Sequence, residues 1–261
     1  MTTLKKRGRP LKTSIKLSTQ PVLVQMDNIK FNDDLFVPML IGNKLDEFFS
    51  SDRGLMKGCN YAFVGDPGVG KSTILLDVLS GLQKNNYKVL FISAEMTSID
   101  LYGYIKRYPK FGSIPILFLG DYHDENPLEI LEETLKEGWD VILVDSMAEV
   151  TTQFTDYFGG TYKSSESKIL NLFDKHNKAY NDNNKNTTFL IIQQVTKQGN
   201  FAGSNRFKHI LTGMAYLKYS EGSRFIFFDK NRRGGCMDCL FFNFDSKDSI
   251  NWLHTSPVNE I

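Results

Sequence analysis

The stretch "GDPGVGKST", residues 65 to 73, lies between the apolar run "NYAFV" and the run "ILLDVL". It fits the pattern G-x-x-x-x-G-K-[ST], and its flanks predict a strand that enters the loop and a helix that leaves it. Gly65, Gly68 and Gly70 allow backbone conformations and close approaches that a Cβ atom would block, so successive N–H groups can face an anion. Because spacing, Lys-Ser pair and context agree, the stretch predicts a phosphate-binding loop rather than a glycine-rich turn without a ligand.

The residues of this loop predict ATP and Mg²⁺ as cofactors. Lys71 would reach the β- and γ-phosphates, and the Ser72 hydroxyl would bind Mg²⁺. The predicted ATP-binding residues are Gly65, Asp66, Pro67, Gly68, Val69, Gly70, Lys71, Ser72 and Thr73.

Length and composition indicate one α/β domain with a tail. The chain has 261 residues, of which 41% are hydrophobic, enough for one full-sized core. It contains no run of eighteen apolar residues, and its basic N-terminus is not followed by a hydrophobic stretch. We therefore expect a cytoplasmic protein of a bacterial or phage-infected cell, without a membrane partner. Three cysteines, Cys59, Cys236 and Cys239, are too few for a disulfide framework and are expected to be ordinary thiols, with a metal or redox role for Cys236 and Cys239 as the alternative.

Residues 1–21 form a predicted basic tail, separate from a domain over 22–261. Residues 1–16 hold six of the 31 lysines and arginines and no acid, so the rest of the chain carries 25 bases against 30 acids. The Arg-Gly-Arg-Pro segment with Arg7 and Arg9 resembles an AT-hook, which places arginines in the minor groove of A·T-rich duplex DNA. A solvated basic leader is the equally weighted alternative.

The remaining pattern alternates strands and helices. We expect strands at 60–65, 88–95, 114–119, 140–146 and 187–195, and helices at 71–85, 97–108 (capped by Thr97 or Ser98) and 127–137. Three further strands at 213–220, 223–230 and 239–245 predict antiparallel hairpins. The expected fold is a mainly parallel sheet with helices on both faces and a C-terminal antiparallel β extension.

Two carboxylates follow predicted strands and indicate a hydrolytic site. Asp145 ends "VILVDS", where open α/β sheets bind ligands, and is expected to hold Mg²⁺ with Ser72. Glu95 ends "FISAE" and is expected to orient the water that attacks the γ-phosphate. The alternatives are an ordinary capping aspartate and a residue that begins a helix.

Five segments in this order resemble the RecA-like ATPase core of the bacterial RadA (Sms) family, a relative of RecA and the DnaB-type helicases. They are "GDPGVGKST", "VLFISAE", "VILVDS", "QQVTKQGNFAGSNRFKHIL" and "DKNRRG". The resemblance covers about residues 40–245 and includes neither the family's zinc finger nor its Lon-protease-like domain. RadA has His where Gln194 stands and Phe where Arg233 stands.

The resemblance implies a homo-oligomer, with a hexameric ring expected and a filament possible. Lys230 and Arg232 would supply positive charge to the neighbouring subunit's nucleotide, whereas a basic hairpin turn is the alternative. Gln194 would sense the γ-phosphate, which completes a catalytic set of Lys71, Glu95, Asp145 and Gln194.

Two polar segments, 151–168 and 196–209, are expected to be mobile loops that bind single-stranded DNA. The candidate DNA-contacting residues are Lys197, Phe201, Arg206 and Lys208, with the aromatic residues Phe154, Tyr157, Phe158 and Tyr162 beside them. The sequence thus predicts a DNA-dependent ATPase, helicase-like, in recombination, repair or replication. A filament-forming recombinase and a non-motor nucleotide switch are the alternatives.

Overall fold

The computed structural model describes residues 23–195, 201–244 and 249–258. Contacts divide the chain into two units, residues 1–32 and 33–261. The described part of the first unit contains one 3₁₀ turn, Met26–Asn28, and no buried side chain. The second unit contains the sheet, the helices and the candidate site.

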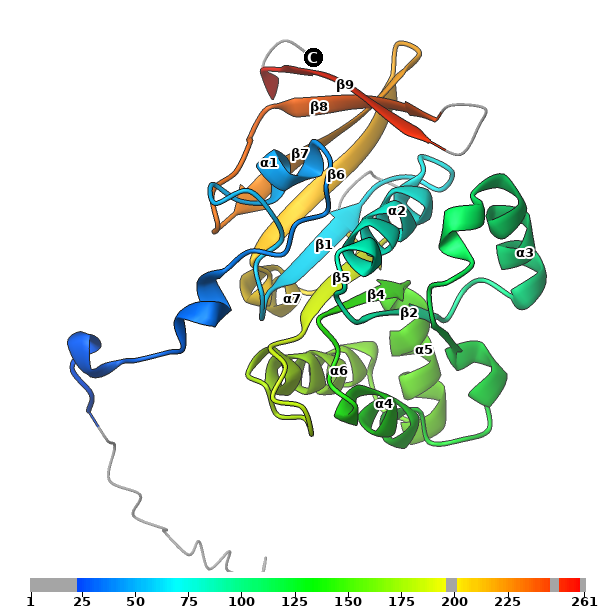
Figure 1. The fold of residues 1–261 in the computed structure, drawn as a ribbon. Coiled ribbons are helices and arrows are strands. Elements are labelled where there is room, and N and C mark those ends of the chain that lie inside the picture. Colours follow the sequence, from blue (N-terminus) through cyan, green and yellow to red (C-terminus); the bar gives the residue numbers. More distant parts are fainter. Residues whose placement is uncertain (1–22, 196–200, 245–248, 259–261) are drawn as a thin grey trace, which may run out of the picture. The chain divides into compact units, whose positions relative to one another are not determined.

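The second unit is built on a nine-stranded sheet in the order β3-β2-β4-β5-β1-β6-β7-β8-β9 within the described residues (Figure 1). The strands are β1 (Asn60–Val64), β2 (Val89–Ser93), β3 (Ile116–Phe118), β4 (Val141–Asp145), β5 (Thr188–Gln193), β6 (Gly213–Ser220), β7 (Ser223–Asn231), β8 (Cys239–Phe244) and β9 (Ile250–Ser256). Neighbours from β3 to β6 pair in parallel, and β6 to β9 pair antiparallel. Strand β6 therefore joins the two halves, and the predicted fold class is confirmed.

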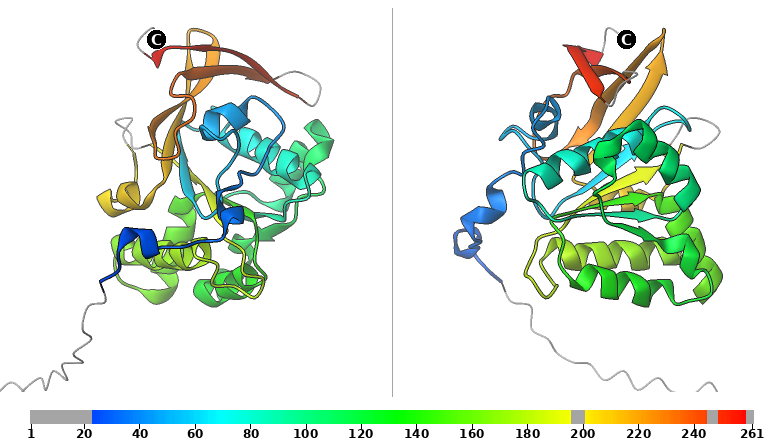
Figure 2. Two further views of the ribbon diagram at one scale, coloured as in Figure 1. Left: turned by 60° about the vertical axis from the view of Figure 1, so that its left-hand side comes forward. Right: turned by 45° about the vertical axis from the view of Figure 1, so that its right-hand side comes forward.

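Helices cover both faces of the parallel half (Figures 1 and 2). They are α1 (Leu45–Phe49), α2 (Lys71–Lys84), α3 (Ser98–Arg107), α4 (Pro127–Lys136), α5 (Met147–Phe158), α6 (Tyr162–Asn177) and α7 (Asn205–Ile210). Because side chains alternate along a strand, each strand contributes to two cores. Tyr61 and Phe63 of β1 pack in the core with α1 and α2, while Ala62 and Val64 pack in the core with α4 to α7.

The strong apolar runs formed strands as predicted. Strands β1, β2, β4 and β5 are buried along their whole lengths, which explains their continuous apolar sequences. Helix α3 begins with the expected cap, because the Thr97 side chain accepts from the Asp100 N–H and Asp100 accepts from the Thr97 N–H. No helix in the described part of the chain is both long and apolar enough to cross a bilayer.

The predicted mobile loop at 151–168 is wrong, because helices α5 and α6 occupy most of it. Ser146 and Thr161 cap the two helices, and only the turn with Gly159 and Gly160 separates them. Phe154 is fully buried against the sheet, although the sequence analysis placed it in a DNA-binding loop. Polar composition therefore hid two amphipathic helices, whose apolar faces are stabilised by packing.

Three shorter elements were also missed. Helix α1 lies in the entry segment, α7 lies in the second predicted loop, and β9 follows the predicted β extension. Strand β9 is only half-buried, so its sequence carries a weak alternation of polar and apolar residues.

Candidate functional site

The loop at 65–73 connects β1 to α2, as its sequence predicts. Gly70 precedes the first residue of α2 with φ of 106°, and Gly68 has φ of 78°, a region that disfavours side chains. Gly65 is needed for a different reason. A Cβ atom there would lie 2.4 Å from the carbonyl oxygen of Leu217 in β6.

Lys71 places its ammonium group at the centre of the loop. Its Nζ donates hydrogen bonds to the carbonyl oxygens of Gly65, at 2.7 Å, and Asp66, at 2.8 Å. Burial lowers the pKa of Lys71, and the nearby carboxylates of Asp145, Glu95 and Asp66 act in the opposite direction. The loop thus holds a cation close to its backbone N–H groups, as triphosphate binding requires.

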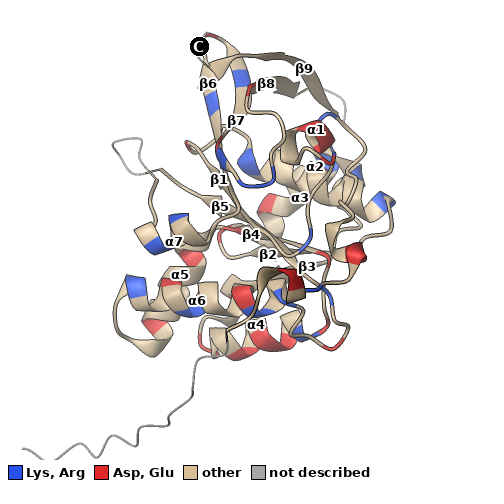
Figure 3. Ribbon diagram, turned by 90° about the vertical axis from the view of Figure 1, so that its left-hand side faces the viewer, with Lys and Arg blue, Asp and Glu red and all other residues tan. Residues whose placement is uncertain are grey.

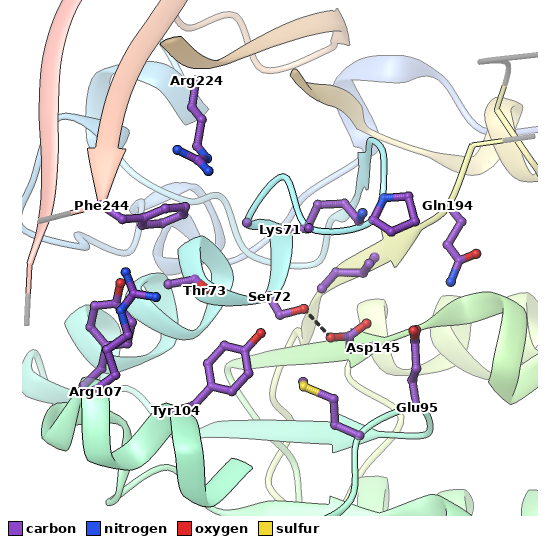
Figure 4. A pocket seen from close by; sticks show the side chains of 16 residues that line it. Lys71, Ser72, Thr73, Glu95, Tyr104, Arg107, Asp145, Gln194, Arg224 and Phe244 are labelled. Carbon is purple, nitrogen blue, oxygen red and sulfur yellow. Dashed lines mark hydrogen bonds between the residues drawn. The ribbon is translucent and has the colours of Figure 1, made fainter. Parts of the chain in front are cut away.

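Asp145 and Ser72 lie side by side, at the end of β4 and the start of α2. The Ser72 hydroxyl donates to Asp145 Oδ2 at 2.6 Å (Figure 4). Burial raises the pKa of Asp145 to about 6, and the Glu95 charge adds to that rise, while the Ser72 hydrogen bond and Lys71 oppose it. No cluster of three or more His, Cys, Asp or Glu residues that could hold a metal occurs in the described ranges. A hydroxyl beside one carboxylate suits Mg²⁺, which keeps several of its waters and also binds phosphate oxygens.

Glu95 and Gln194 complete one end of the same pocket, which has a volume of about 580 Å³. The register of β2 and β4 pairs Ser93 with Asp145, so Glu95 follows β2 at the same edge of the sheet. Gln194 follows the last residue of β5. Figure 4 shows both side chains near Asp145 on one side of the pocket. The four residues of the predicted catalytic set therefore line a single pocket.

The other end of the pocket contains side chains that the sequence analysis missed. They are Tyr104, Arg107 and Tyr108 from the α3 region, Arg224 of β7 and Phe244 of β8. The α3 residues carried a usable signal, because Tyr104 and Arg107 are three residues apart on a helix that follows Glu95. Arg224 and Phe244 carried none, since only the β extension brings them to the loop.

Lys230 and Arg232 lie away from this chain's pocket. Lys230 lies near the end of β7 and Arg232 follows that strand, where Asn231 pairs with Gly213 at the end of β6 remote from the loop. Lys230 Nζ donates to the Lys208 carbonyl at 2.7 Å, and Arg232 Nη2 donates to the His209 carbonyl at 3.2 Å. Both cations thus rest on the carbonyl oxygens at the end of α7, which leaves a role at another subunit's site as a prediction.

The predicted DNA-contacting residues divide into three groups. Arg206 and Lys208 are exposed on α7, where basic residues gather (Figure 3). Phe201 is only 7% exposed and packs on Phe207, so its ring is enclosed in the core and we remove it from the candidates for base stacking. Lys197, Arg7 and Arg9 lie outside the described residues.

Exposed aromatic side chains gather instead at the turn between α5 and α6. Tyr157, Phe158 and Tyr162 are 46%, 36% and 39% exposed. The Lys168 ammonium lies 4.1 Å from the centre of the Phe158 ring. Exposed rings beside a cation can bind single-stranded nucleic acid by base stacking and phosphate contact.

Comparison with known proteins supports the resemblance read from the sequence. The chain is 31% identical over 201 residues to the DNA repair protein RadA of Campylobacter jejuni, an alignment that covers 76% of this chain and 43% of that protein. It is 29% identical over 199 residues to RadA of Aquifex aeolicus, covering 74% and 42%. The chain thus spans less than half the length of these relatives. No protein-family model matches it.

A solved structure supports the fold. The KaiC-like protein PH0186 of Pyrococcus horikoshii superposes with a TM-score of 0.57 at 15% identity, over 80% of this chain and 97% of that one. At this identity the likeness concerns the fold alone.

Proposed function

We propose that this chain, a RadA-like RecA-fold ATPase core, is a Mg²⁺-dependent ATP hydrolase. It acts as a motor on single-stranded DNA in repair, recombination or replication. The observation that carries the proposal is the meeting of Lys71, Ser72, Asp145 and Glu95 in one pocket. These residues come from separate strand ends and the phosphate-binding loop, and each has the chemistry that phosphoryl transfer needs.

The residues fit ATP and its metal. A pocket of about 580 Å³ lies within the usual range for small-molecule sites. The loop N–H groups and Lys71 would bind the phosphates, and Ser72 and Asp145 would hold Mg²⁺. The metal, when bound, neutralises charge that develops on the phosphate oxygens.

Glu95 orients the attacking water and Gln194 contacts the γ-phosphate side of the pocket. A carboxylate at this edge accepts a hydrogen bond from water and aligns it with the scissile bond, which lowers the entropic part of the barrier. A pure nucleotide switch does not need such an acid. We therefore favour hydrolysis over switching alone.

A homo-oligomer places Lys230 and Arg232 of one subunit against the nucleotide of the next. The proposal rests on the position of both residues away from their own pocket and on the family resemblance of "DKNRRG". A cation supplied by a neighbour stabilises the transition state and links hydrolysis to subunit movement. The α5–α6 turn and the basic residues of α7 then contact the DNA strand.

The first experiment measures ATP binding and turnover in single-residue variants, with and without single-stranded DNA. Lys71→Ala should lose both binding and turnover, whereas Glu95→Gln should bind ATP and lose hydrolysis by orders of magnitude. Glu129→Gln, an exposed change on α4, is the matched control and should behave as wild type. Near-normal turnover by Glu95→Gln would remove this residue from catalysis.

The second experiment mixes two inactive variants. Arg232→Ala keeps a sound phosphate loop, while Lys71→Ala still supplies the cation, so their mixture should hydrolyse more ATP than the sum of the two alone. Electron microscopy with an ATP analogue and single-stranded DNA would show a ring for a motor and a helical array for a filament-forming recombinase. Normal hydrolysis by Arg232→Ala would leave "DKNRRG" as a basic turn.

A further inference from the structure

The pocket continues from the phosphate-binding loop into a second compartment. Thr73, Tyr104, Arg107 and Tyr108 also line an adjoining pocket of about 310 Å³. With phosphates fixed on the loop, the nucleoside must extend from the loop toward this side. We call the end of the main pocket beside it the base compartment; it is lined by Tyr104, Arg107, Tyr108, Arg224 and Phe244. Figure 4 shows Tyr104 and Arg107 on one side of Phe244 and Arg224 on the other.

Phe244 forms an aromatic wall of the base compartment. Its ring edge lies against Gly70, where an added Cβ atom would be 2.3 Å from Cζ. The guanidinium of Arg224 lies over the ring, with its central carbon 5.2 Å from the ring centre. Figure 4 shows Phe244 between Arg224 and the side chains of Tyr104 and Arg107. Stacking on such rings does not distinguish bases, because every base has a π-face.

The charged groups of the base compartment, among the described residues, are two arginines. The guanidinium carbon of Arg107 lies 5.3 Å from the centre of the Tyr108 ring, and that of Arg224 lies 4.8 Å from the centre of the Tyr219 ring. Among the described residues, neither guanidinium has an acidic side chain within 4.0 Å, and the Arg224 Nε is buried without a hydrogen-bond partner. An arginine has five N–H donors and no acceptor.

Among the described residues, the other polar side chains of this compartment are the hydroxyls of Thr73, Tyr104 and Tyr108, and none is a carboxylate or an amide. Asp100 lines the adjoining pocket and not the base compartment itself, and its Oδ2 accepts from the Thr97 N–H at 2.9 Å and the Thr97 hydroxyl at 2.7 Å. The one amide side chain among the described pocket residues, Gln194, lies at the opposite end beside Glu95.

Adenine and guanine differ in what they offer to these donors. Guanine presents two acceptors, O6 and N7, which arginine binds as a pair, whereas adenine presents one acceptor and an amino donor, which asparagine or glutamine binds as a pair. We propose that Arg107 and Arg224 are specificity-determining residues that make the site accept GTP at least as well as ATP. This inference rests on the proposed nucleotide site and names its substrate class as purine nucleoside triphosphates.

The test compares kcat/KM and equilibrium binding for ATP and GTP with Mg²⁺, using β,γ-imido analogues for binding. The wild type should show a GTP to ATP ratio of kcat/KM of about one or above. Arg107→Gln and Arg224→Gln replace a donor fork by an amide, and each should shift this ratio toward ATP by roughly tenfold. Arg53→Gln, an exposed arginine paired with Glu47 at 3.0 Å, is the matched control and should leave the ratio unchanged.

Each outcome decides the inference. A wild-type preference for ATP of more than about threefold in kcat/KM overturns it. Equal losses of kcat/KM for ATP and GTP in both arginine variants also overturn it. The guanidinium groups would then bind the phosphates or the ribose, which the two nucleotides share. If neither analogue binds wild-type protein, the proposed function itself is wrong. If only the ATP analogue binds, the proposed function is retained and the inferred acceptance of GTP is wrong.

Discussion

Replacing Asp145 with asparagine should stabilise the protein in the absence of nucleotide and Mg²⁺. The carboxylate is 4% exposed, and its burial raises the pKa from 3.8 to about 6. This rise corresponds to about 3 kcal/mol of penalty on the ionised native state. The asparagine side chain would keep an acceptor for the Ser72 hydroxyl while removing the buried charge.

The expected gain depends on pH in a defined direction. The native pKa lies above the unfolded value, so between pH 4 and 6 the native state binds more protons than the unfolded chain. The penalty is therefore absent below about pH 4, grows through this interval and is complete above about pH 6. Because Lys71 loses a favourable neighbour in the variant, we expect a net gain of about 1 to 3 kcal/mol at pH 7.5. At 2–4 °C per kcal/mol for a domain of this size, this means a rise in Tm of roughly 2–12 °C.

The assay is urea unfolding of wild type and Asp145→Asn at pH 7.5 and pH 4, with Asp156→Asn as an exposed control on α5. The variant should be more stable at pH 7.5 and nearly equal to wild type at pH 4. Addition of Mg²⁺ and ATP should reverse the order at pH 7.5, since only the wild type gains full binding energy. A variant that is no more stable than wild type at pH 7.5, with the control unchanged, would show that the charge of ionised Asp145 does not destabilise the native state.

Three further predictions concern the loop, the aromatic turn and the tail. Gly70→Ala should weaken ATP binding at least tenfold, because φ of 106° disfavours a side chain and the new methyl meets the Phe244 ring; a titration with a fluorescent ATP analogue measures this. Tyr157→Ala with Phe158→Ala should lower affinity for single-stranded DNA by roughly tenfold or more without changing ATP turnover in its absence, as read by fluorescence anisotropy. Deleting residues 1–16 should flatten the salt dependence of duplex binding, because six cations leave, and an unchanged slope would make this segment a solvated leader.

Local sequence was enough to predict the residues at the phosphate end of the site. The phosphate-binding loop is a single continuous stretch, so Lys71 and Ser72 could be read from a motif whose spacing reflects backbone geometry. Asp145 and Glu95 could be placed because buried strands are recognisable by continuous apolar runs, and parallel strands end at one edge of the sheet.

Sequence composition misled where packing outweighs local preference. The segment 151–168 is rich in polar and small residues, yet α5 and α6 bury Phe154 and Phe173 against the sheet. Their helical period was present, but a few glycine, serine and threonine residues concealed it. Phe201 was likewise assigned to a binding surface, although its ring lies in the core.

The sequence by itself determined the parallel core, the phosphate-binding loop and the acids at the strand ends, because each depends on neighbours along the chain. Only the tertiary structure decided what forms the base compartment. Arg224 and Phe244 reach the loop because β6 joins the parallel sheet to the antiparallel extension and thereby carries β7 and β8 to its edge. Such a contact between residues distant in sequence follows from strand pairing across the whole sheet, and no local pattern around Gly70 encodes it.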